Sequence, residues 1–408
     1  MYIKYIVFTS VYNVRVYSLS ASQLISDDHI KYIYYQQLWS DRFLSSVTAR
    51  REAILFAMIS GKWPCFKRFL ILLLVAAVAL VLYQGALPRT QQFYGKSALD
   101  SGRDNLFSEQ KALPWWEGGD CRCNGNSCFP EEAPSFSWED AGGACGRRAW
   151  LAGGGQKVIS FALFGNKSQY WKAFRKNLNA TRTMYPGWVV WLFTDPRGRE
   201  NVLCPLLRDF PHFYICDVTQ LPSLGNVTSI HNMIWRTLPL GDERVSAFFV
   251  RDTDSLLLER GAAAVREWMS GNKSFHLLRD HPYHGIPVMG GLWGARWDLK
   301  THNVSEFRKN LTGVRSAMIK AAKGKFKKGV DQHILMKVLY PKTKGDVMSH
   351  DSFFCKKYPD GFRPFPIQRE KGHYLRNYMG VRENDKLFVK TPCPEACRPK
   401  NHQDWTYC

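Results

Sequence analysis

Residues 248–255 read FFVRDTDS, an apolar β-type run that ends in two aspartates, Asp252 and Asp254. Successive side chains on an extended strand point to opposite faces, so residues i and i+2 share a face. The pattern therefore predicts two carboxylates presented together at the end of a strand. Paired carboxylates suit Mg²⁺ or Mn²⁺, which keep coordination positions open for phosphate oxygens and water. Because D-x-D also occurs in turns and at helix N-termini, its surroundings must decide its meaning.

Strands and helices alternate before this motif. Apolar strand-like runs are expected at residues 157–164, 187–193 and 213–217, and helical spacing at residues 170–184 and 202–207. This alternation predicts parallel βαβ units in a doubly wound α/β sheet with helices on both faces. Ligands of such open sheets bind at the carboxyl ends of the strands, where the two aspartates are expected to lie.

Length and composition indicate a folded protein. The 408 residues are 45% hydrophobic and 14% aromatic, which excludes a disordered chain and allows one large or two modest domains. After the first predicted strand the sequence has neither G-x-G-x-x-G nor G-x4-G-K-S/T, which argues against a dinucleotide enzyme and a P-loop NTPase. A nucleotide site must therefore be built in another way.

The apolar run at residues 69–87 predicts a short membrane helix, since about 17 to 20 such residues span a bilayer. Lys62, Lys67 and Arg68 precede it, whereas Arg89 is the nearby positive charge that follows it. The positive-inside rule then predicts a cytoplasmic N-terminus and a lumenal remainder. A cleaved signal peptide is the alternative, but the long segment before the run favours a type II signal-anchor.

The segment before the anchor, residues 1–68, is expected to be a cytoplasmic tail. Residues 1–57 contain no cofactor motif and no strong periodicity, and Met58 stands just ahead of a compact basic-then-apolar segment. Met58 is therefore a candidate for the true start of the protein.

Two residue patterns agree with a lumenal location. Six N-x-S/T sequons lie beyond the apolar run, at Asn166, Asn179, Asn226, Asn272, Asn303 and Asn310. Ten of the eleven cysteines lie there too: Cys121, Cys123, Cys128, Cys145, Cys204, Cys216, Cys355, Cys393, Cys397 and Cys408. An even number suits disulfide bonds in an oxidising compartment. Zinc is the alternative for the first four, but the C-x-C-x4-C spacing lacks paired C-x2-C knuckles.

Composition divides the lumenal part into three. Residues 88–155 are rich in Gly, Pro, Ser and charge and are predicted to form a stem with a small disulfide-tied patch. Residues 156–358 carry the alternating pattern and form the predicted catalytic domain. Residues 359–408 are predicted to be a cysteine-containing C-terminal tail.

A type II anchor, a stem, an α/β domain and D-x-D about ninety residues after its first strand together resemble a Golgi glycosyltransferase of the GT-A fold. The resemblance implies a mixed, mostly parallel sheet and a catalytic domain in the Golgi lumen. It also implies that Asp252 and Asp254 hold Mn²⁺ or Mg²⁺ and that the cation grips the diphosphate of a nucleotide sugar. Asp252 would in addition face the ribose. The sugar, of hexosyl or N-acetylhexosaminyl type, would pass to a glycan or glycoconjugate.

Two arginines near the motif are candidates for the phosphates, namely Arg251 and Arg236. A guanidinium can bind phosphate oxygens through two parallel hydrogen bonds. Structural ion pairing is the alternative role for either side chain.

The segment after the motif contains a glycine-tryptophan loop that is similar to the GT-A loop beneath the donor sugar. Gly290, Gly291 and Trp293 are the donor or acceptor candidates, because a backbone without side chains lets sugar hydroxyls approach. Asp280 is a candidate general base or sugar ligand. A surface ion pair with the adjacent Arg279 is the alternative for Asp280.

Two further candidates follow in the chain. Asp331 and Gln332 begin an amphipathic helix, and a D-Q pair at that place resembles one that faces acceptor or donor sugar in several GT-A families. Asp331 also suits the helix N-terminus through the helix dipole. His350 resembles the C-terminal histidine that completes the metal site in some GT-A enzymes, and the alternative is an ordinary core or solvated histidine.

The formal net charge is +21, and lysines crowd the stretch before Asp331, at Lys320, Lys323, Lys325, Lys327 and Lys328. A basic face attracts anionic nucleotide sugars or an acidic glycan acceptor, although most lysine runs are simply solvated. Nucleic acid is not an expected partner in this compartment.

Two other functions remain open from the sequence. One is a glycan-binding pseudoenzyme of the same fold, and the other is a phosphosugar transferase, which would need additional metal ligands. Retention or inversion at the anomeric carbon is also open. Inversion needs a base, for which Asp280 and Asp331 are the candidates.

Overall fold

The computed structural model describes residues 6–10, 13–17, 113–132, 142–299, 303–369, 377–382 and 389–408. The chain divides into two units, Met1–Arg103 and Asp104–Cys408. In the first unit the structure describes an antiparallel hairpin of β1 (Ile6–Ser10) and β2 (Asn13–Tyr17). The predicted anchor at residues 69–87 lies outside the described residues. No helix in the described ranges is both long enough and apolar enough to cross a bilayer.

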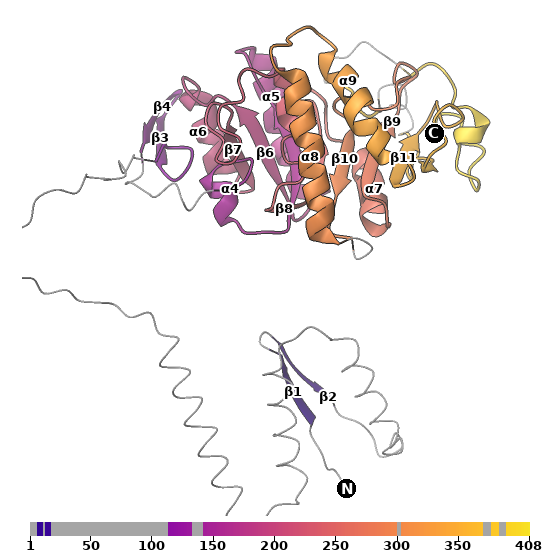
Figure 1. Ribbon diagram of the computed structural model, residues 1–408, viewed down its shortest axis with the longest axis horizontal. Coiled ribbons are helices and arrows are strands. Elements are labelled where there is room, and N and C mark those ends of the chain that lie inside the picture. Colours follow the sequence, from indigo (N-terminus) through magenta and orange to yellow (C-terminus); the bar gives the residue numbers. More distant parts are fainter. Residues whose placement is uncertain are drawn as a thin grey trace, which may run out of the picture. The chain divides into compact units, whose positions relative to one another are not determined.

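An eight-stranded sheet organises the second unit, in the order β12-β11-β9-β10-β8-β5-β6-β7 (Figure 1). Its strands are β5 (Gln156–Ala162), β6 (Trp188–Thr194), β7 (Phe213–Asp217), β8 (Val245–Val250), β9 (Phe275–Arg279), β10 (Trp293–Arg296), β11 (Val347–Asp351) and β12 (Phe362–Arg363). β10 runs antiparallel to β8 and β9, and the other neighbouring pairs are parallel. The prediction of a mixed, mostly parallel α/β sheet is confirmed.

Helices cover both faces of this sheet. The longer ones are α5 (Ser168–Met184), α6 (Glu200–Asp209), α7 (Glu259–Ser270) and α8 (Val304–Ala322). The shorter ones are α4 (Arg147–Leu151), η3 (Asn232–Thr237), α9 (Val330–Ile334), η4 (Leu335–Leu339), α10 (Tyr340–Thr343) and η5 (Glu395–Cys397). Side chains of α5, α6 and α7 share one hydrophobic core, and those of α4, η3, α8 and α9 share the core on the opposite face. Figure 1 shows α8 and α9 side by side on their face.

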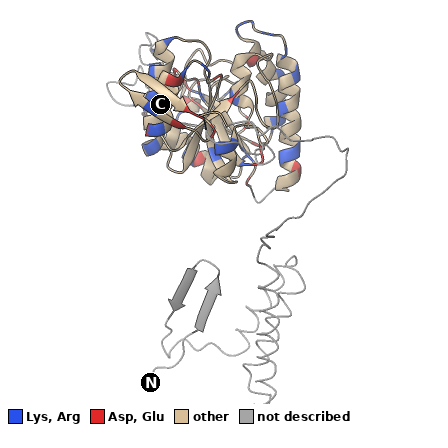
Figure 2. Ribbon diagram, turned by 90° about the vertical axis from the view of Figure 1, so that its left-hand side faces the viewer, with Lys and Arg blue, Asp and Glu red and all other residues tan. Residues whose placement is uncertain are grey.

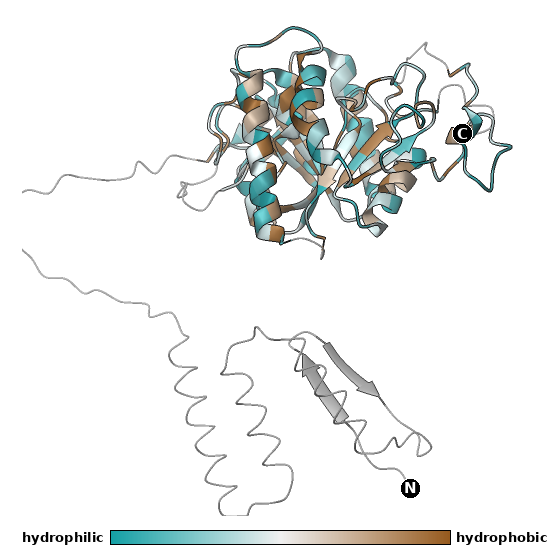
Figure 3. Ribbon diagram, turned by 45° about the vertical axis from the view of Figure 1, so that its right-hand side comes forward, coloured by the Kyte–Doolittle hydropathy of each residue, from teal (hydrophilic) through white to brown (hydrophobic). Residues whose placement is uncertain are grey.

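The sequence explains why these segments take these positions. In β5, Val158 belongs to one core and Ile159 and Phe161 to the other, so both faces of the strand are apolar. In α5, Trp171 and Phe174 are buried at helical spacing and pack against the sheet. Figure 3 shows the resulting pattern, in which brown hydrophobic segments gather at the sheet and teal segments lie on the outer sides of the helices.

Disulfide bonds fasten both ends of the second unit to its centre. All ten cysteines predicted to be lumenal are paired, as Cys121–Cys204, Cys123–Cys128, Cys145–Cys216, Cys355–Cys397 and Cys393–Cys408. The prediction of disulfide bonds rather than zinc is confirmed. Two of the bonds join the predicted stem to α6 and β7, and a third joins the C-terminal segment to the end of β11.

The segment predicted as a stem therefore belongs, from Leu113 onward, to the compact unit. Trp115 and Trp116 are buried in the same core as α5, and the hairpin of β3 (Asp120–Asn124) and β4 (Ser127–Glu131) contacts α6. The composition predicted a stem with a small disulfide-tied patch. The described residues of that segment, 113–132 and 142–155, are attached to the domain by buried tryptophans and long-range disulfide bonds.

Candidate functional site

A cleft of about 540 Å³ lies beyond the carboxyl ends of β5 and β8. Phe164 follows β5, Asp252 follows β8, and both line the cleft. Because β5 and β8 are parallel neighbours, their carboxyl ends meet at the same edge of the sheet. The rest of the lining comes from η3 and the residue before it, the loop before α9, and α9 itself: His231, Asn232, Met233, Arg236, Phe326, Lys328, Gly329, Asp331 and Gln332.

Arg236 joins the two carboxylates of the cleft. Its side chain is 2% exposed, its Nη1 donates a hydrogen bond to Asp252 Oδ1, and its Nη2 lies 3.4 Å from Asp331 Oδ2. A buried guanidinium needs acceptors for its donors, and these two carboxylates supply them. Arg236 thus fixes a residue after β8 and a residue of α9 in one arrangement.

Two buried glycines pack their backbone directly against these side chains. A Cβ atom on Gly290 would lie 2.5 Å from Gln332 Nε2 and 2.9 Å from both Arg236 Nη2 and Asp331 Oδ2. A Cβ atom on Gly291 would lie 2.3 Å from Asp252 Oδ2. Backbone alone fits against the charged groups here. Of the residues proposed from the sequence, the structure therefore brings together Arg236, Asp252, Gly290, Gly291, Asp331 and Gln332.

The first turn of α9 places Asp331 and Gln332 at the cleft. Gly329, just before the helix, has φ +84°, a left-handed conformation that glycine adopts without strain and that other residues rarely adopt. It turns the exposed lysine-rich loop into a buried helix. The negative Asp331 side chain also suits the positive end of the helical segment.

Two buried polar atoms beside the cleft have no hydrogen-bond partner among the described residues, Arg236 Nε and Gln332 Oε1. Buried polar atoms are nearly always paired in folded proteins, and exceptions concentrate at functional sites. Both atoms belong to side chains that line the cleft, and other buried polar atoms without a hydrogen-bond partner lie elsewhere in the described part of the chain.

Asp254 lies beside the cleft but does not line it. Its Oδ2 is 3.7 Å from Arg382 Nη1, in the segment that returns to the site from the C-terminal part. Burial and then the negative charge of Asp252 raise the pKa of Asp254. The two carboxylates are therefore close enough to repel each other, which favours a bound cation.

The strand geometry expected for the D-x-D motif is wrong in detail. β8 ends at Val250, so Asp252 and Asp254 lie in the turn that follows and not on the strand itself. The side chains still alternate between the two faces of the sheet one residue past the end of β8, because Arg251 points away from the cleft that Asp252 lines. The turn, and not the pleat of the strand, sets the positions of the two carboxylates.

Arg251 does not reach the cleft. It is 1% exposed, its guanidinium lies 4.5 Å from the ring centroid of Phe249, and its Nη1 donates to Val250 O at 2.8 Å. The predicted contact with phosphates is therefore not supported for Arg251, because its side chain is in the core on the opposite side of the sheet from Asp252.

Trp293 does not line the cleft. It is fully buried in β10, and its ring packs edge-on against Phe248 with centroids 5.2 Å apart. The tryptophan belongs to the hydrophobic core that η3, α8 and α9 share. A direct contact between Trp293 and a sugar is therefore not supported.

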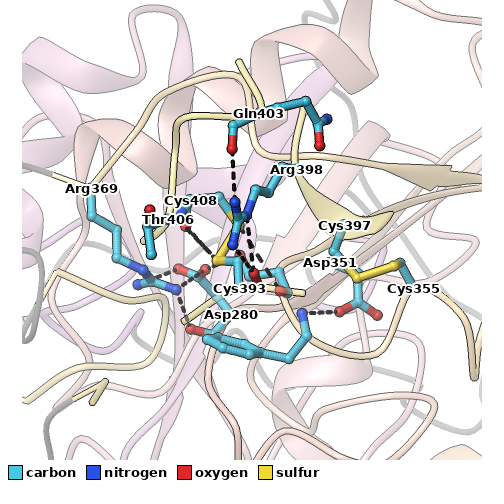
Figure 4. The surroundings of a disulfide bond; sticks show 12 residues. Asp280, Asp351, Cys355, Arg369, Cys393, Cys397, Arg398, Gln403, Thr406 and Cys408 are labelled. Carbon is cyan, nitrogen blue, oxygen red and sulfur yellow. Dashed lines mark hydrogen bonds and ion pairs between the residues drawn. A yellow bond between two sulfur atoms is a disulfide. The ribbon is translucent and has the colours of Figure 1, made fainter. Parts of the chain in front are cut away.

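Asp280 is the centre of a buried ion cluster away from the cleft (Figure 4). Its carboxylate accepts hydrogen bonds from Arg260, Arg369 and Ser352 at 2.7–3.0 Å. Burial would raise the pKa of Asp280, but the two arginine charges outweigh it and lower the pKa to about 2. A carboxylate that is fully buried and this weakly basic cannot serve as a general base, and the surface ion pair with Arg279 does not form either, because Arg279 pairs with Asp351 and Asp280 pairs in the core with Arg260 and Arg369.

His350 lies apart from the D-x-D aspartates. It is fully buried in β11, its Nδ1 is 2.8 Å from His276 Nε2, and its Nε2 is 3.1 Å from Glu267 Oε2. Burial lowers the pKa of both imidazoles. Its partners occupy both ring nitrogens, so the predicted contribution of His350 to the metal site is not supported.

Within the described residues, no group of three or more His, Cys, Asp or Glu side chains is arranged to hold a metal ion. Two carboxylates nevertheless fit a cation whose other positions are filled by phosphate oxygens and water. Asp252 Oδ1 is engaged by Arg236, whereas Oδ2 faces Gly291. Asp252 Oδ2 and the Asp254 carboxylate are thus the candidate ligands.

Sequence reasoning missed several lining residues. Phe164 could have been found, because it is the last residue of the first predicted strand, at the ligand-binding edge of the sheet. His231, Asn232 and Met233 had no such signal. They reach the cleft because the chain between β7 and β8 folds across it, and Phe326 does so through the loop before α9.

The chain matches no protein-family model and no curated protein sequence. Two solved structures resemble part of it. One is a glycosyltransferase involved in the glycosylation of the major capsid of PBCV-1, with 14% identity and a TM-score of 0.28 over 50% of this chain and 87% of that chain. The other is S. aureus TarS 1–349, with 10% identity and a TM-score of 0.32 over 48% of this chain and 57% of that chain.

Proposed function

We propose that this protein is a metal-dependent glycosyltransferase that moves a hexosyl or N-acetylhexosaminyl group from a nucleotide sugar to a glycan or glycoconjugate. One observation carries the proposal. Asp252, Arg236, Asp331 and Gln332 converge on a single cleft at the carboxyl edge of a mostly parallel sheet, and the backbone of Gly290 and Gly291 packs against them.

The proposed donor site uses opposite charges in close contact. Asp252 and Asp254 would hold Mn²⁺ or Mg²⁺, which when bound stabilises the negative charge that develops on the departing diphosphate. Arg236 directs its guanidinium into the same site and would bind a phosphate oxygen. Gly290 and Gly291 would let these side chains keep their positions, because a side chain at either place would displace them.

Asp331 is the proposed catalytic carboxylate, and Gln332 a sugar-binding amide. In transfer, a bond forms between the acceptor oxygen and the anomeric carbon, and the bond from that carbon to the diphosphate breaks. If the product is inverted, the acceptor proton goes to Asp331. If configuration is retained, the proton goes to the leaving phosphate and Asp331 orients a sugar hydroxyl.

We place the enzyme in the Golgi membrane as a single-pass type II protein with its catalytic domain in the lumen. Five disulfide bonds in the second unit support an oxidising compartment. The asparagines of all six sequons are exposed, as N-glycosylation requires.

The proposal is tested by incubating the full chain with a panel of nucleotide sugars, with and without Mn²⁺, and measuring release of nucleoside diphosphate. Manganese-dependent release with one donor, lost in Asp254→Asn and Asp252→Asn, is the expected result. Asp404→Asn is the matched control, since it makes the same change at an aspartate that is 78% exposed and far along the chain from the cleft lining.

Two results would contradict the proposal in different ways. Manganese-dependent binding of a nucleotide without turnover for any donor would leave a glycan-binding pseudoenzyme. Transfer of the sugar together with its phosphate, with release of a nucleoside monophosphate, would identify a phosphosugar transferase.

A further inference from the structure

The geometry points to an acidic acceptor: we propose that the cleft takes an oligosaccharide bearing carboxylate or sulfate groups, bound along the Lys323–Gly329 loop. This inference rests on the proposed function, because it assigns the acceptor side of the same cleft. The inference depends on where the charged groups lie. The carboxylates of Asp252 and Asp331 line the cleft, and the lysine ammonium groups lie on the loop beside it.

The floor is already matched to a donor. Asp252 and Asp331 are bridged by Arg236, and the remaining oxygen of Asp252 faces Gly291. A cation bound there and Arg236 together supply the positive charge that a diphosphate needs. The lysines of the neighbouring loop are not needed to neutralise the diphosphate, so they are available to a second anionic partner.

The Lys323–Gly329 loop, which supplies Phe326, Lys328 and Gly329 to the cleft, carries four lysines. Lys323, Lys325, Lys327 and Lys328 are all exposed, and across the described residues none of their ammonium groups has an ion-pair partner. Lys328 lines the cleft itself. Unpaired lysines of one sign attract an anion through the field that they add together, within a Debye length of about 8–10 Å.

Backbone contacts hold this loop in place. Ile230 and Lys323 form an isolated β-bridge, Gly324 N donates to Ser229 O at 2.9 Å, and His231 Nε2 lies 3.1 Å from Lys327 O. The loop is therefore tied to the segment that also lines the cleft. A fixed loop loses less conformational entropy on binding a ligand than a free one does.

Two exposed aromatic rings stand at the same place. Phe326 is 59% exposed and Phe164 is 43% exposed, and both line the cleft. Phe326 and Lys328 alternate along the loop, and both reach the cleft. An apolar ring beside a positive charge matches a sugar that presents C–H groups on one face and an anionic substituent at its edge.

The charge of the whole chain works in the same direction. The net charge is +21, and Figure 2 shows more blue Lys and Arg than red Asp and Glu over the described unit. Long-range attraction raises the rate at which an anionic polymer reaches the cleft. Long-range attraction does not discriminate between sugars. We assign that discrimination to contacts with Phe326 and Lys328.

The test measures binding of defined hexasaccharides to the full chain by calorimetry. The probes are chondroitin sulfate, unsulfated chondroitin and neutral chitohexaose, which separate sulfate from carboxylate and both from chain length. We expect at least about tenfold tighter binding of an acidic hexasaccharide than of chitohexaose. We also expect a loss of about tenfold for that ligand in Lys325→Gln/Lys327→Gln/Lys328→Gln.

The matched control is Lys337→Gln/Lys342→Gln/Lys344→Gln, which removes the same charge from exposed lysines that do not line the cleft. It should change the affinity less than about twofold, because none of these side chains lines the cleft and can contact the ligand there. Phe326→Ala should weaken the acidic ligand without altering the salt dependence of binding, since it removes contact area and no charge.

Three outcomes would overturn the inference. Equal affinity for acidic and neutral hexasaccharides would show that the cleft does not prefer an acidic acceptor. Equal losses of affinity in the two triple variants would show that only the net charge of the protein matters. Weaker Mn²⁺-dependent binding of UDP or GDP in the cleft triple would show that the lysines hold the donor. The proposed function fails separately, if wild-type protein binds neither nucleotide with Mn²⁺ while its hexasaccharide binding remains intact.

Discussion

Arg236 is the residue on which the geometry of the cleft depends. It is buried, and its guanidinium is shared between Asp252 and Asp331. In this arrangement the arginine neutralises one of the two carboxylates proposed to bind the cation. Cation and arginine therefore compete for Asp252, and they act together only when a diphosphate separates them.

Arg236→Ala should consequently move two affinities in opposite directions. Binding of Mn²⁺ alone should tighten several-fold, because Asp252 loses its neutralising partner, whereas binding of nucleoside diphosphate with Mn²⁺ should weaken by about tenfold or more. Titration of free Mn²⁺ by electron paramagnetic resonance measures the first and calorimetry the second. A parallel loss of both would mean that Arg236 acts chiefly in folding.

Gly291→Ala tests whether the residue packed against Asp252 must lack a side chain. The new methyl group would lie 2.3 Å from Asp252 Oδ2, so the carboxylate must move, at a cost of about 1–3 kcal/mol. We expect Mn²⁺ affinity and transfer to fall about tenfold or more. Gly313→Ala is the control, because its Cβ meets nothing within 4 Å and alanine favours helix α8 by up to about 1 kcal/mol. Full activity in Gly291→Ala would show that the position of Asp252 is not critical.

At the scale of elements, the Asp280 cluster joins α7, β9 and the C-terminal segments. Arg260 of α7 and Arg369 both bind this carboxylate, and Arg260 Nη2 also donates to Cys408 O at 2.6 Å. Met379 N donates to it as well. The cluster thus holds together parts of the chain that share no strand pairing.

Asp280→Asn should therefore destabilise the fold by about 3–5 kcal/mol, because two buried arginines lose their counter-charge. The wild-type carboxylate, with its pKa lowered to about 2, contributes stability that is present above pH 4 and is lost as the pH falls through 2. The variant should lack that acid-dependent loss. Chemical denaturation between pH 2 and pH 6 measures both, and an unchanged stability of Asp280→Asn would contradict the role given to the cluster.

At the scale of the whole molecule, Glu117 connects the N-terminal extension to the domain. It is 5% exposed and accepts a hydrogen bond from Arg148 N at 3.1 Å, at the start of α4. Burial raises the pKa of Glu117 to about 7. The attachment of residues 113–119 is therefore sensitive to pH in the neutral range.

The sign of this dependence follows from proton binding. Between about pH 4.5 and pH 7 the folded protein keeps a proton that the unfolded chain has lost, so Glu117 makes stability fall by about 3 kcal/mol as the pH rises. Buried His284, with a pKa lowered to about 4, acts in the opposite direction. The difference between wild type and Glu117→Gln in thermal unfolding isolates the first effect. Exposed Glu395→Gln is the control, and a slope unchanged by Glu117→Gln would rule out this role.

The sequence by itself determined the elements and the disulfide-bonded character of the second unit, because periodic apolar residues and an even cysteine count are local signals. The strand-end pattern predicted Asp252, Arg236 was a candidate from its place near the motif, and the resemblance to GT-A enzymes pointed to Gly290, Gly291, Asp331 and Gln332. Only the tertiary structure decided that Asp280, His350, Arg251 and Trp293 are core residues. Burial depends on what packs against a side chain from distant segments, such as Arg369 against Asp280 or Glu267 against His350. Packing between distant segments also brings Phe164, His231 and Phe326 to the cleft.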